Sequence, residues 1–230
     1  MLKKVSPVNL SKLPIVPVCR GESIESERCR VSWENRDWLL KIKKQSANEI
    51  AGYQIADYLT IPVQPWAACF KCESKSGSSD EVHTAILVEW WPSISSIARL
   101  CEPAKSHPTI VACALALAVF DRHEWPGWLM DNAGNLRLHD LDFIGPPFPS
   151  NYPEQSLSDY RDFTESAFSE AQASAHGTGL AEAFAKALRE IQNLDFAAIL
   201  DFGGHPDADA IVDRLVVGLA ARQSALSRLL

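Results

Sequence analysis

The pattern of apolar residues changes part-way along this 230-residue chain, and the change limits the folds that it can adopt. Before Trp91-Pro92, short segments alternate apolar and polar residues as half-buried strands do, apart from one helical stretch at 46–59. After that point the spacing is mostly helical. The sequence therefore predicts an α+β protein of two lobes. Residues 1–91 would form an antiparallel sheet with one helix, and residues 92–230 a mostly helical lobe.

Individual elements follow from the same periodicities and from their end signals. Ser46 is a suitable N-cap for the helix at 46–59, with Glu49 three residues later as a capping-box partner. The prolines in Ile61-Pro-Val-Gln-Pro65 would end that helix. A four-residue turn is expected at Glu34–Asp37. We expect strands at 15–18, 28–33, 38–42, 66–70 and 84–88, and later helices at 108–120, 156–172, 178–192 and 206–229.

Composition is that of an ordinary globular protein, with 47% hydrophobic and 22% charged residues. No apolar run approaches the roughly 20 residues that span a bilayer, and the first residues lack the apolar core of a signal peptide. We therefore expect a cytoplasmic protein without membrane contact. The six cysteines are scattered and are expected to be free thiols. Cys69 and Cys72 have a metal-ligand spacing but no second pair, which favours two strand cysteines over a zinc site.

The net charge of −7 argues against direct nucleic-acid binding. Charge is unevenly distributed, because residues 1–44 hold 10 Lys+Arg against 5 Asp+Glu, whereas the remainder holds 12 against 24. A basic first portion facing an acidic second portion would suit an anion held between two lobes. Ordinary variation of surface charge accounts for the same numbers equally well.

Lys41 is the first candidate functional residue. It lies between Leu40 and Ile42 on an expected strand, and a lysine with apolar neighbours needs an anionic partner. Glu49, on the helix that follows, is the candidate partner. The alternative is a lysine in solvent on an edge strand, accompanied by Lys43 and Lys44.

Two further segments have a weaker signal. The connector Val88-Glu-Trp-Trp-Pro92 would place backbone groups of Glu89 and the ring of Trp90 where an adenine could bind. Core tryptophans between two layers are the alternative. The segment Gly21–Ser26 has one glycine, so a plain hairpin turn is favoured there over a phosphate-binding loop.

Asp121 directly follows the apolar helix expected at 108–120. Such a helix should be buried, because it is apolar almost all round. A carboxylate at a helix C-terminus is disfavoured by the helix dipole. Something must hold it there, either Arg122 or the hydroxyl group of a substrate. We expect Asp121 to position such a hydroxyl and to accept its proton.

Asp140 and Asp142 alternate along an apolar stretch, which places both carboxylates on one face. Two such groups repel each other unless a cation or a proton lies between them. Carboxylate oxygens favour Mg²⁺ over zinc as that cation. The alternative is a turn that one of the aspartates caps.

In order and spacing, these pieces resemble the HipA-like branch of the protein-kinase fold. Trp38-Leu-Leu-Lys-Ile42 is similar to the strand with the ATP-binding lysine, and residues 48–63 resemble the Glu-bearing helix and its exit. Phe120-Asp-Arg-His123 resembles the catalytic loop, and Leu138-His-Asp-Leu-Asp-Phe143 the metal-binding strand. The stretch from Gly204 to Leu230 resembles the closing helix of short HipA-like proteins.

The resemblance implies a bilobal, kinase-like fold that binds ATP and Mg²⁺ and transfers a phosphoryl group to a protein or small-molecule hydroxyl. It implies Lys41 and Glu49 for the phosphates, Asp121 for catalysis and Asp140 for the metal. The family has an Asn about five residues after the catalytic Asp, and here that place falls in Glu124-Trp-Pro-Gly-Trp128. Either Asp142 or Glu124 replaces it, or the protein binds nucleotide without turning it over. Three functions remain open: a HipA-like kinase, a pseudokinase that acts as a scaffold, and a small-molecule kinase.

Overall fold

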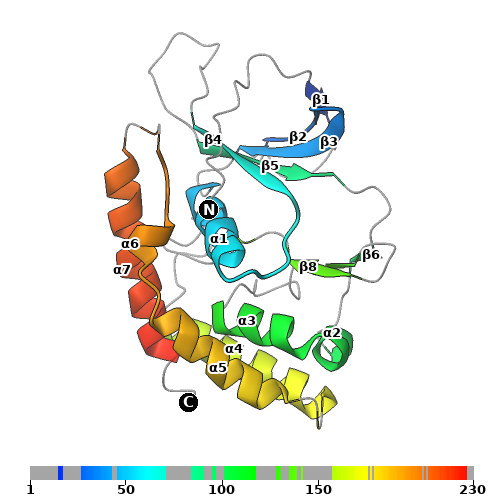
Figure 1. Ribbon diagram of the computed structural model, residues 1–230, viewed down its shortest axis with the longest axis vertical. Coiled ribbons are helices and arrows are strands. Elements are labelled where there is room, and N and C mark those ends of the chain that lie inside the picture. Colours follow the sequence, from blue (N-terminus) through cyan, green and yellow to red (C-terminus); the bar gives the residue numbers. More distant parts are fainter. Residues whose placement is uncertain are drawn as a thin grey trace.

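The fold is that of a computed structural model, in which the elements are arranged as Figure 1 shows. The structure describes residues 15–17, 27–42, 46–70, 84–90, 95–96, 101–117, 128–130, 135–138, 141, 157–175, 177, 179–203, 205 and 207–226.

The first part of the chain forms a five-stranded antiparallel sheet in the order β1-β2-β3-β5-β4. Its strands are β1 (Ile15–Pro17), β2 (Glu27–Trp33), β3 (Arg36–Ile42), β4 (Trp66–Phe70) and β5 (Thr84–Glu89). A strand was expected from the sequence at each of these five places. Strand β3 lies in the middle of this order, with β2 on one side and β5 on the other.

The turn between β2 and β3 is shorter than the sequence predicts. It contains two residues, Glu34 and Asn35, with φ angles of 51° and 60°. Two successive positive φ angles are typical of a type I′ hairpin turn, whose twist matches that of the flanking strands. The expected four-residue turn is therefore wrong, because Arg36 and Asp37 already pair with Trp33 and Ser32.

Helix α1 (Ser46–Tyr58) packs against β5, with its side chains buried from Ser46 to Tyr53. It ends where expected, in a left-handed residue, Thr60, with φ 57°. The Thr60 N–H donates to Asp57 O and the Ile61 N–H to Ala56 O, which is the Schellman pattern. The expected capping box is wrong, because the Glu49 carboxylate bonds to the sheet and to no N-cap amide among the described residues.

The second part contains a small antiparallel sheet, β6-β7-β8, and most of the helices. The strands are β6 (Ser95–Ser96), β7 (Trp128–Met130) and β8 (Leu136–Leu138). The helices are α2 (Cys101–Ser106), α3 (Pro108–Leu117), α4 (Leu157–Ser174), α5 (Leu180–Gln192), α6 (Phe196–Ile199) and α7 (Ala208–Leu226). The long helices match the predicted ranges, whereas α2, α6 and β6 were not predicted.

One apolar core connects the two parts. Helix α3 is almost fully buried, as its composition predicts, and it packs mainly on α5. In Figure 1, α3, α4 and α5 lie below the small sheet, and α7 runs down the left side of the view, past α1. Of the helices that the structure describes, none combines the length and the hydrophobicity needed to cross a membrane. The fold is α+β, with an N-terminal antiparallel sheet that carries one helix and a mostly helical C-terminal part, as expected.

Candidate functional site

Lys41 lies at the centre of the large sheet. Its Cα pairs with Arg28 on β2 and with Ile86 on β5, and only 4% of the residue is exposed. A lysine on a central strand is flanked by backbone on both sides, so its ammonium group can leave the sheet only towards one face. The alternative of an edge-strand lysine in solvent is therefore wrong.

The ammonium group of Lys41 forms an ion pair with Glu49 on α1. The distance between Lys41 Nζ and Glu49 Oε1 is 2.6 Å, and 5% and 0% of the two side chains are exposed. The pair joins β3 to the first turn of α1. The partner that the sequence suggested for Lys41 is therefore confirmed.

The second carboxylate oxygen of Glu49, Oε2, is buried and has no hydrogen-bond partner within the described part of the chain. Burying both members of an ion pair is costly, because each charge loses its hydration, and apolar residues of similar volume often give equal or greater stability. An acceptor left unsatisfied adds to that penalty. The pair is thus poorly explained by stability alone, which makes it a candidate functional element.

Glu89 and Trp90 lie at the end of β5, where the chain leaves the sheet. The Glu89 N–H donates to Pro65 O at 2.9 Å, and the Trp90 N–H donates to Asp37 O at 2.8 Å. The Glu89 carbonyl accepts from Gln64 Nε2 at 3.1 Å, and its side chain pairs with Arg36. Both N–H groups are thus used within the protein, whereas a carbonyl oxygen can accept a second bond. A contact between Glu89 and adenine stays a prediction. The Glu89 carbonyl oxygen is the backbone group that could accept a hydrogen bond from the adenine.

The predicted catalytic and metal-binding aspartates, Asp121, Asp140 and Asp142, lie outside the described residues, as does Glu124. The strand that leads to Asp140 is described. The Leu138 N–H donates to Pro62 O at 2.9 Å, and the Leu138 carbonyl accepts from the Gln64 N–H at 3.3 Å. Strand β8 is thereby bonded to the segment that follows α1, in a parallel bridge between Val63 and Leu138. The roles of the three aspartates stay predictions.

Metal-binding residues do not cluster within the described ranges, where no group of three or more His, Cys, Asp or Glu side chains could hold an ion. Cys72 lies outside those ranges, so the Cys69–Cys72 spacing is not tested. Cys113 on α3 is a free thiol. Burial, and secondly the nearby carboxylate of Glu190, raises the pKa of the Cys113 thiol to about 11. This thiol is therefore protonated at neutral pH.

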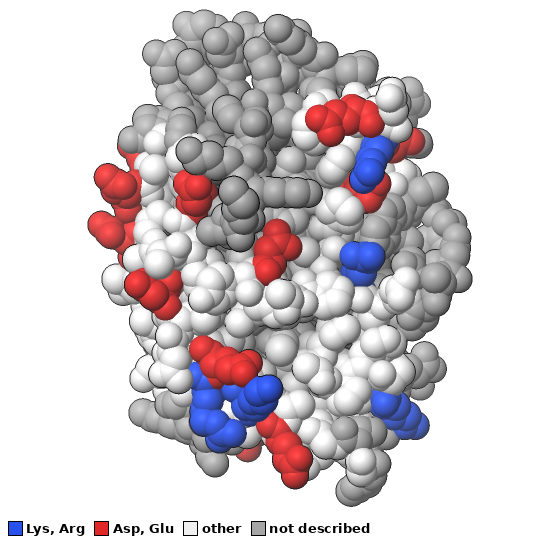
Figure 2. All heavy atoms as spheres, in the orientation of Figure 1, with Lys and Arg blue, Asp and Glu red and all other residues white. Residues whose placement is uncertain are grey.

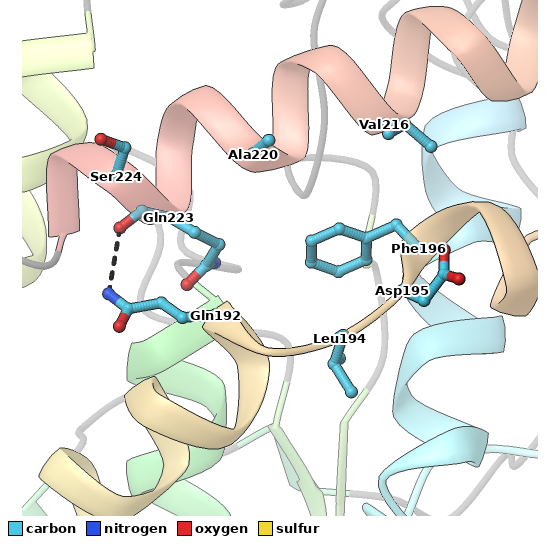
Figure 3. Close-up of a pocket in the computed structure, with 8 residues that line it drawn as sticks. All are labelled: Gln192, Leu194, Asp195, Phe196, Val216, Ala220, Gln223 and Ser224. Carbon is cyan, nitrogen blue, oxygen red and sulfur yellow. Dashed lines mark hydrogen bonds between the residues drawn. The ribbon is translucent and has the colours of Figure 1, made fainter.

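A separate cavity of about 430 Å³ lies between the α5–α6 connection and α7, as Figure 3 shows. None of the residues predicted for a site lines it. Its walls combine apolar side chains with two amides, and Asp195 is the charged residue among them. The Asp195 carboxylate accepts from the Ala198 N–H as the N-cap of α6. The lining residues are Gln192, Leu194, Asp195, Phe196, Val216, Ala220, Gln223 and Ser224.

Acidic side chains gather on the edge of the molecule that α7 forms, as Figure 2 shows. Asp207, Asp209 and Asp213 are all exposed there. They account for part of the negative balance of the second portion. Most of the basic residues among positions 1–44 lie outside the described ranges, so a basic surface facing an acidic one stays a prediction.

No protein-family model and no curated protein matches this chain. Among solved structures it is similar to the proinflammatory kinase CtkA of Helicobacter pylori, with a TM-score of 0.56 and 12% sequence identity. That similarity covers 97% of this chain and 98% of that chain. The PAN3 pseudokinase of Neurospora crassa is less similar, with a TM-score of 0.39 and 11% identity over 100% of this chain and 67% of that chain. The second likeness is too weak to carry an argument.

Together with the sheet order and the helix between β3 and β4, the similarity to CtkA defines a protein with a kinase-like fold. The expected fold class is confirmed. An identity of 12% shows the fold alone, so the narrower HipA-like assignment stays a prediction.

Proposed function

We propose that this protein is an ATP-dependent phosphotransferase of HipA-like type, which transfers the γ-phosphoryl group of Mg-ATP to a Ser, Thr or small-molecule hydroxyl. The observation that carries the proposal is the buried Lys41–Glu49 pair, which occupies β3 and the following helix of a kinase-like fold. In such folds a Lys–Glu pair of this kind aims the ammonium group at the nucleotide phosphates.

A triphosphate fits the residues that the structure describes here. The Lys41 ammonium is a positive charge held in a buried position, where its attraction to an anion is screened less than in solvent. Glu49 fixes the direction of that charge, because its carboxylate forms a short bond with the flexible lysine side chain. In the proposed mechanism Lys41 orients the phosphates and Glu49 keeps Lys41 in place.

The remaining roles fall to residues that the sequence predicts. Asp121 would position the acceptor hydroxyl and take its proton, and the segment of Glu89 and Trp90 would hold the adenine. Asp140 and Asp142 would hold Mg²⁺, whose chemistry is to neutralise charge on the transferring phosphoryl group. Most of the catalysis would then come from positioning and electrostatic stabilisation.

A second candidate is a pseudokinase that binds nucleotide or a protein partner without phosphoryl transfer. Two observations favour it: the segment after Asp121 lacks the expected Asn, and the N–H groups of Glu89 and Trp90 are already bonded within the protein. The acceptor hydroxyl, and so the choice between a protein kinase and a small-molecule kinase, depends on residues beyond the described ranges.

Calorimetric titration with Mg-ATP tests nucleotide binding. We expect the wild type to bind and Lys41→Met to bind at least tenfold more weakly. Lys186→Met is the matched control, because Lys186 forms an exposed pair with Glu190 and should leave binding unchanged. Absence of binding by the folded wild-type protein would overturn the proposal.

Transfer of labelled γ-phosphate to the protein itself or to a lysate tests turnover. The expected result is transfer by the wild type and its loss in Asp121→Asn, with binding retained. Binding without any consumption of ATP would instead establish the second candidate.

A further inference from the structure

Gln54 bonds helix α1 to the segment between α6 and α7. Gln54 Nε2 donates to the Asp201 carbonyl at 2.6 Å, and the Asp201 N–H donates to Gln54 Oε1 at 3.1 Å. One side-chain amide thus binds both polar groups of one backbone residue, 147 positions away in sequence. Because two bonds fix distance and direction together, this contact is more restrictive than a single hydrogen bond. We refer to the pair of bonds between Gln54 and Asp201 as the amide clasp.

The Asp201 end of the amide clasp is well anchored. Asp201 lies between α6 and α7, and its neighbours Leu200 and Phe202 are 6% and 1% exposed. Its carboxylate accepts from the Gly203 N–H at 2.7 Å, and a Cβ at residue 203 would lie 2.9 Å from that carboxylate oxygen. The backbone at Asp201 is therefore held in place by the core on both sides and by its own side chain.

The other end of the amide clasp is on the helix that carries Glu49. Gln54 is five positions after Glu49, about 7.5 Å along the helix axis. Over that length a helix moves as a rigid body. Ile50, Tyr53 and Ile55 pack α1 into the core, and the amide clasp adds two hydrogen bonds, which depend strongly on distance and angle. A displacement of α1 that breaks the amide clasp would also shift Glu49 relative to Lys41.

We propose that Gln54 is a positioning residue, which holds α1 on the C-terminal helices so that Glu49 stays bonded to Lys41. The inference rests on the proposed function in one respect, which is that the Lys41–Glu49 pair serves to bind nucleotide. It assigns the position of α1 to a contact built into the chain, with no need for a partner or a modification to bring the helix into place.

The test measures the reactivity of Lys41 towards a small amine-acylating reagent, site by site, by mass spectrometry and without nucleotide. Gln54→Met keeps the length of the side chain and removes both bonds of the amide clasp. We expect Lys41 to react about five- to tenfold faster in this variant, since each lost bond makes opening easier. Gln192→Met is the matched control, because Gln192 also donates an amide to a backbone carbonyl, that of Gln223, and does so away from α1.

Exposed Lys186 serves as an internal reference whose rate should not change. The effect should also pass through Glu49, so Gln54→Met should add little to the Lys41 reactivity of Glu49→Gln. If Gln54 had only a structural role, Gln54→Met would raise the reactivity of Lys41 both in the wild type and in Glu49→Gln. It would also lower the unfolding temperature in both proteins, whether or not Glu49 is present. An unchanged Lys41 rate in Gln54→Met, or an additive effect with Glu49→Gln, would overturn the inference.

Gln54→Glu is the second variant, in case the first does not fold. It keeps the acceptor for the Asp201 N–H and loses the donor, so we expect a smaller rise in Lys41 reactivity. Failure of both variants to fold would also overturn the inference, because Gln54 would then act in folding and not in positioning. A wild type that binds no Mg-ATP would end the proposed function and leave these labelling results as they stand.

Discussion

Lys41 Nζ lies 2.6 Å from Glu49 Oε1, with both side chains buried, whereas the ion pairs Arg36–Glu89 and Lys186–Glu190 reach solvent. Exposed pairs contribute little to stability, while removal of one member of a buried pair leaves an uncompensated charge. The two kinds of pair should therefore respond differently to mutation.

Glu49→Gln should lower the free energy of unfolding by about 3 kcal/mol, because it removes the charge of the carboxylate that is paired with the buried Lys41 ammonium. Urea unfolding followed by circular dichroism measures the loss. Lys186→Met should change stability by no more than about 0.5 kcal/mol, as an exposed helix pair does. Equal effects of the two substitutions would contradict the buried geometry. The double variant Lys41→Met/Glu49→Leu should recover much of the loss while abolishing nucleotide binding.

Thr60→Gly should stabilise the protein by about 1 kcal/mol, since Thr60 has a φ of 57° and a left-handed conformation is unfavourable for a residue with a Cβ. Within the described residues its hydroxyl bonds to the adjacent Leu59 carbonyl alone, so little is lost with the side chain. The measurement is again the urea midpoint. Ala210→Gly, at an exposed position of α7, should instead destabilise by about 1 kcal/mol. A loss of stability in Thr60→Gly would mean that the Schellman turn is not formed.

The hairpin between β2 and β3 should tolerate a better turn sequence. Glu34→Asn combined with Asn35→Gly gives the pair that type I′ turns prefer, and we expect a gain of about 1 kcal/mol in unfolding free energy. Asn193→Gly, at a φ of −93°, is the control and should bring no gain. If the hairpin variant is less stable than the wild type, the two-residue turn is wrong.

Stability at alkaline pH should depend on Cys113. Its thiol has a pKa raised from 9.0 to about 11 in the folded state, chiefly by burial, so the folded state holds this proton more tightly than the unfolded state. The resulting stabilisation is fully present below pH 9.0 and is lost as the pH rises to about 11. Wild type should lose more unfolding free energy than Cys113→Ala between these values. Parallel pH profiles for the two proteins would contradict the burial of this thiol.

The arrangement of strands and long helices could be predicted because each has a periodic pattern of its own. The Lys41–Glu49 pair could also be predicted, since a lysine flanked by Leu40 and Ile42 on a strand calls for a partner, and Glu49 lies near the start of the helix that follows. The same reasoning failed at the N-cap. Glu49 fitted both the capping-box spacing from Ser46 and the role of a partner for Lys41, and its carboxylate bonds to Lys41.

Other features leave no signal in a single sequence. Helix α6 has four residues, too few for a helical period. The amide clasp joins positions 147 residues apart, and the glutamine at one end is an ordinary helix residue. The cavity beside Phe196 depends on how α7 packs, which spacing alone does not fix.

The amide clasp has a consequence for how the protein is made. A chain leaves the ribosome with its N-terminus first, at about 5–20 residues per second, so synthesis from Gln54 to Asp201 takes on the order of ten seconds. During that interval α1 and the large sheet are complete as sequence, but the backbone groups that hold α1 do not yet exist. The nascent N-terminal part is therefore expected to hold Lys41 loosely, and to gain its final geometry only after Asp201 has been synthesised.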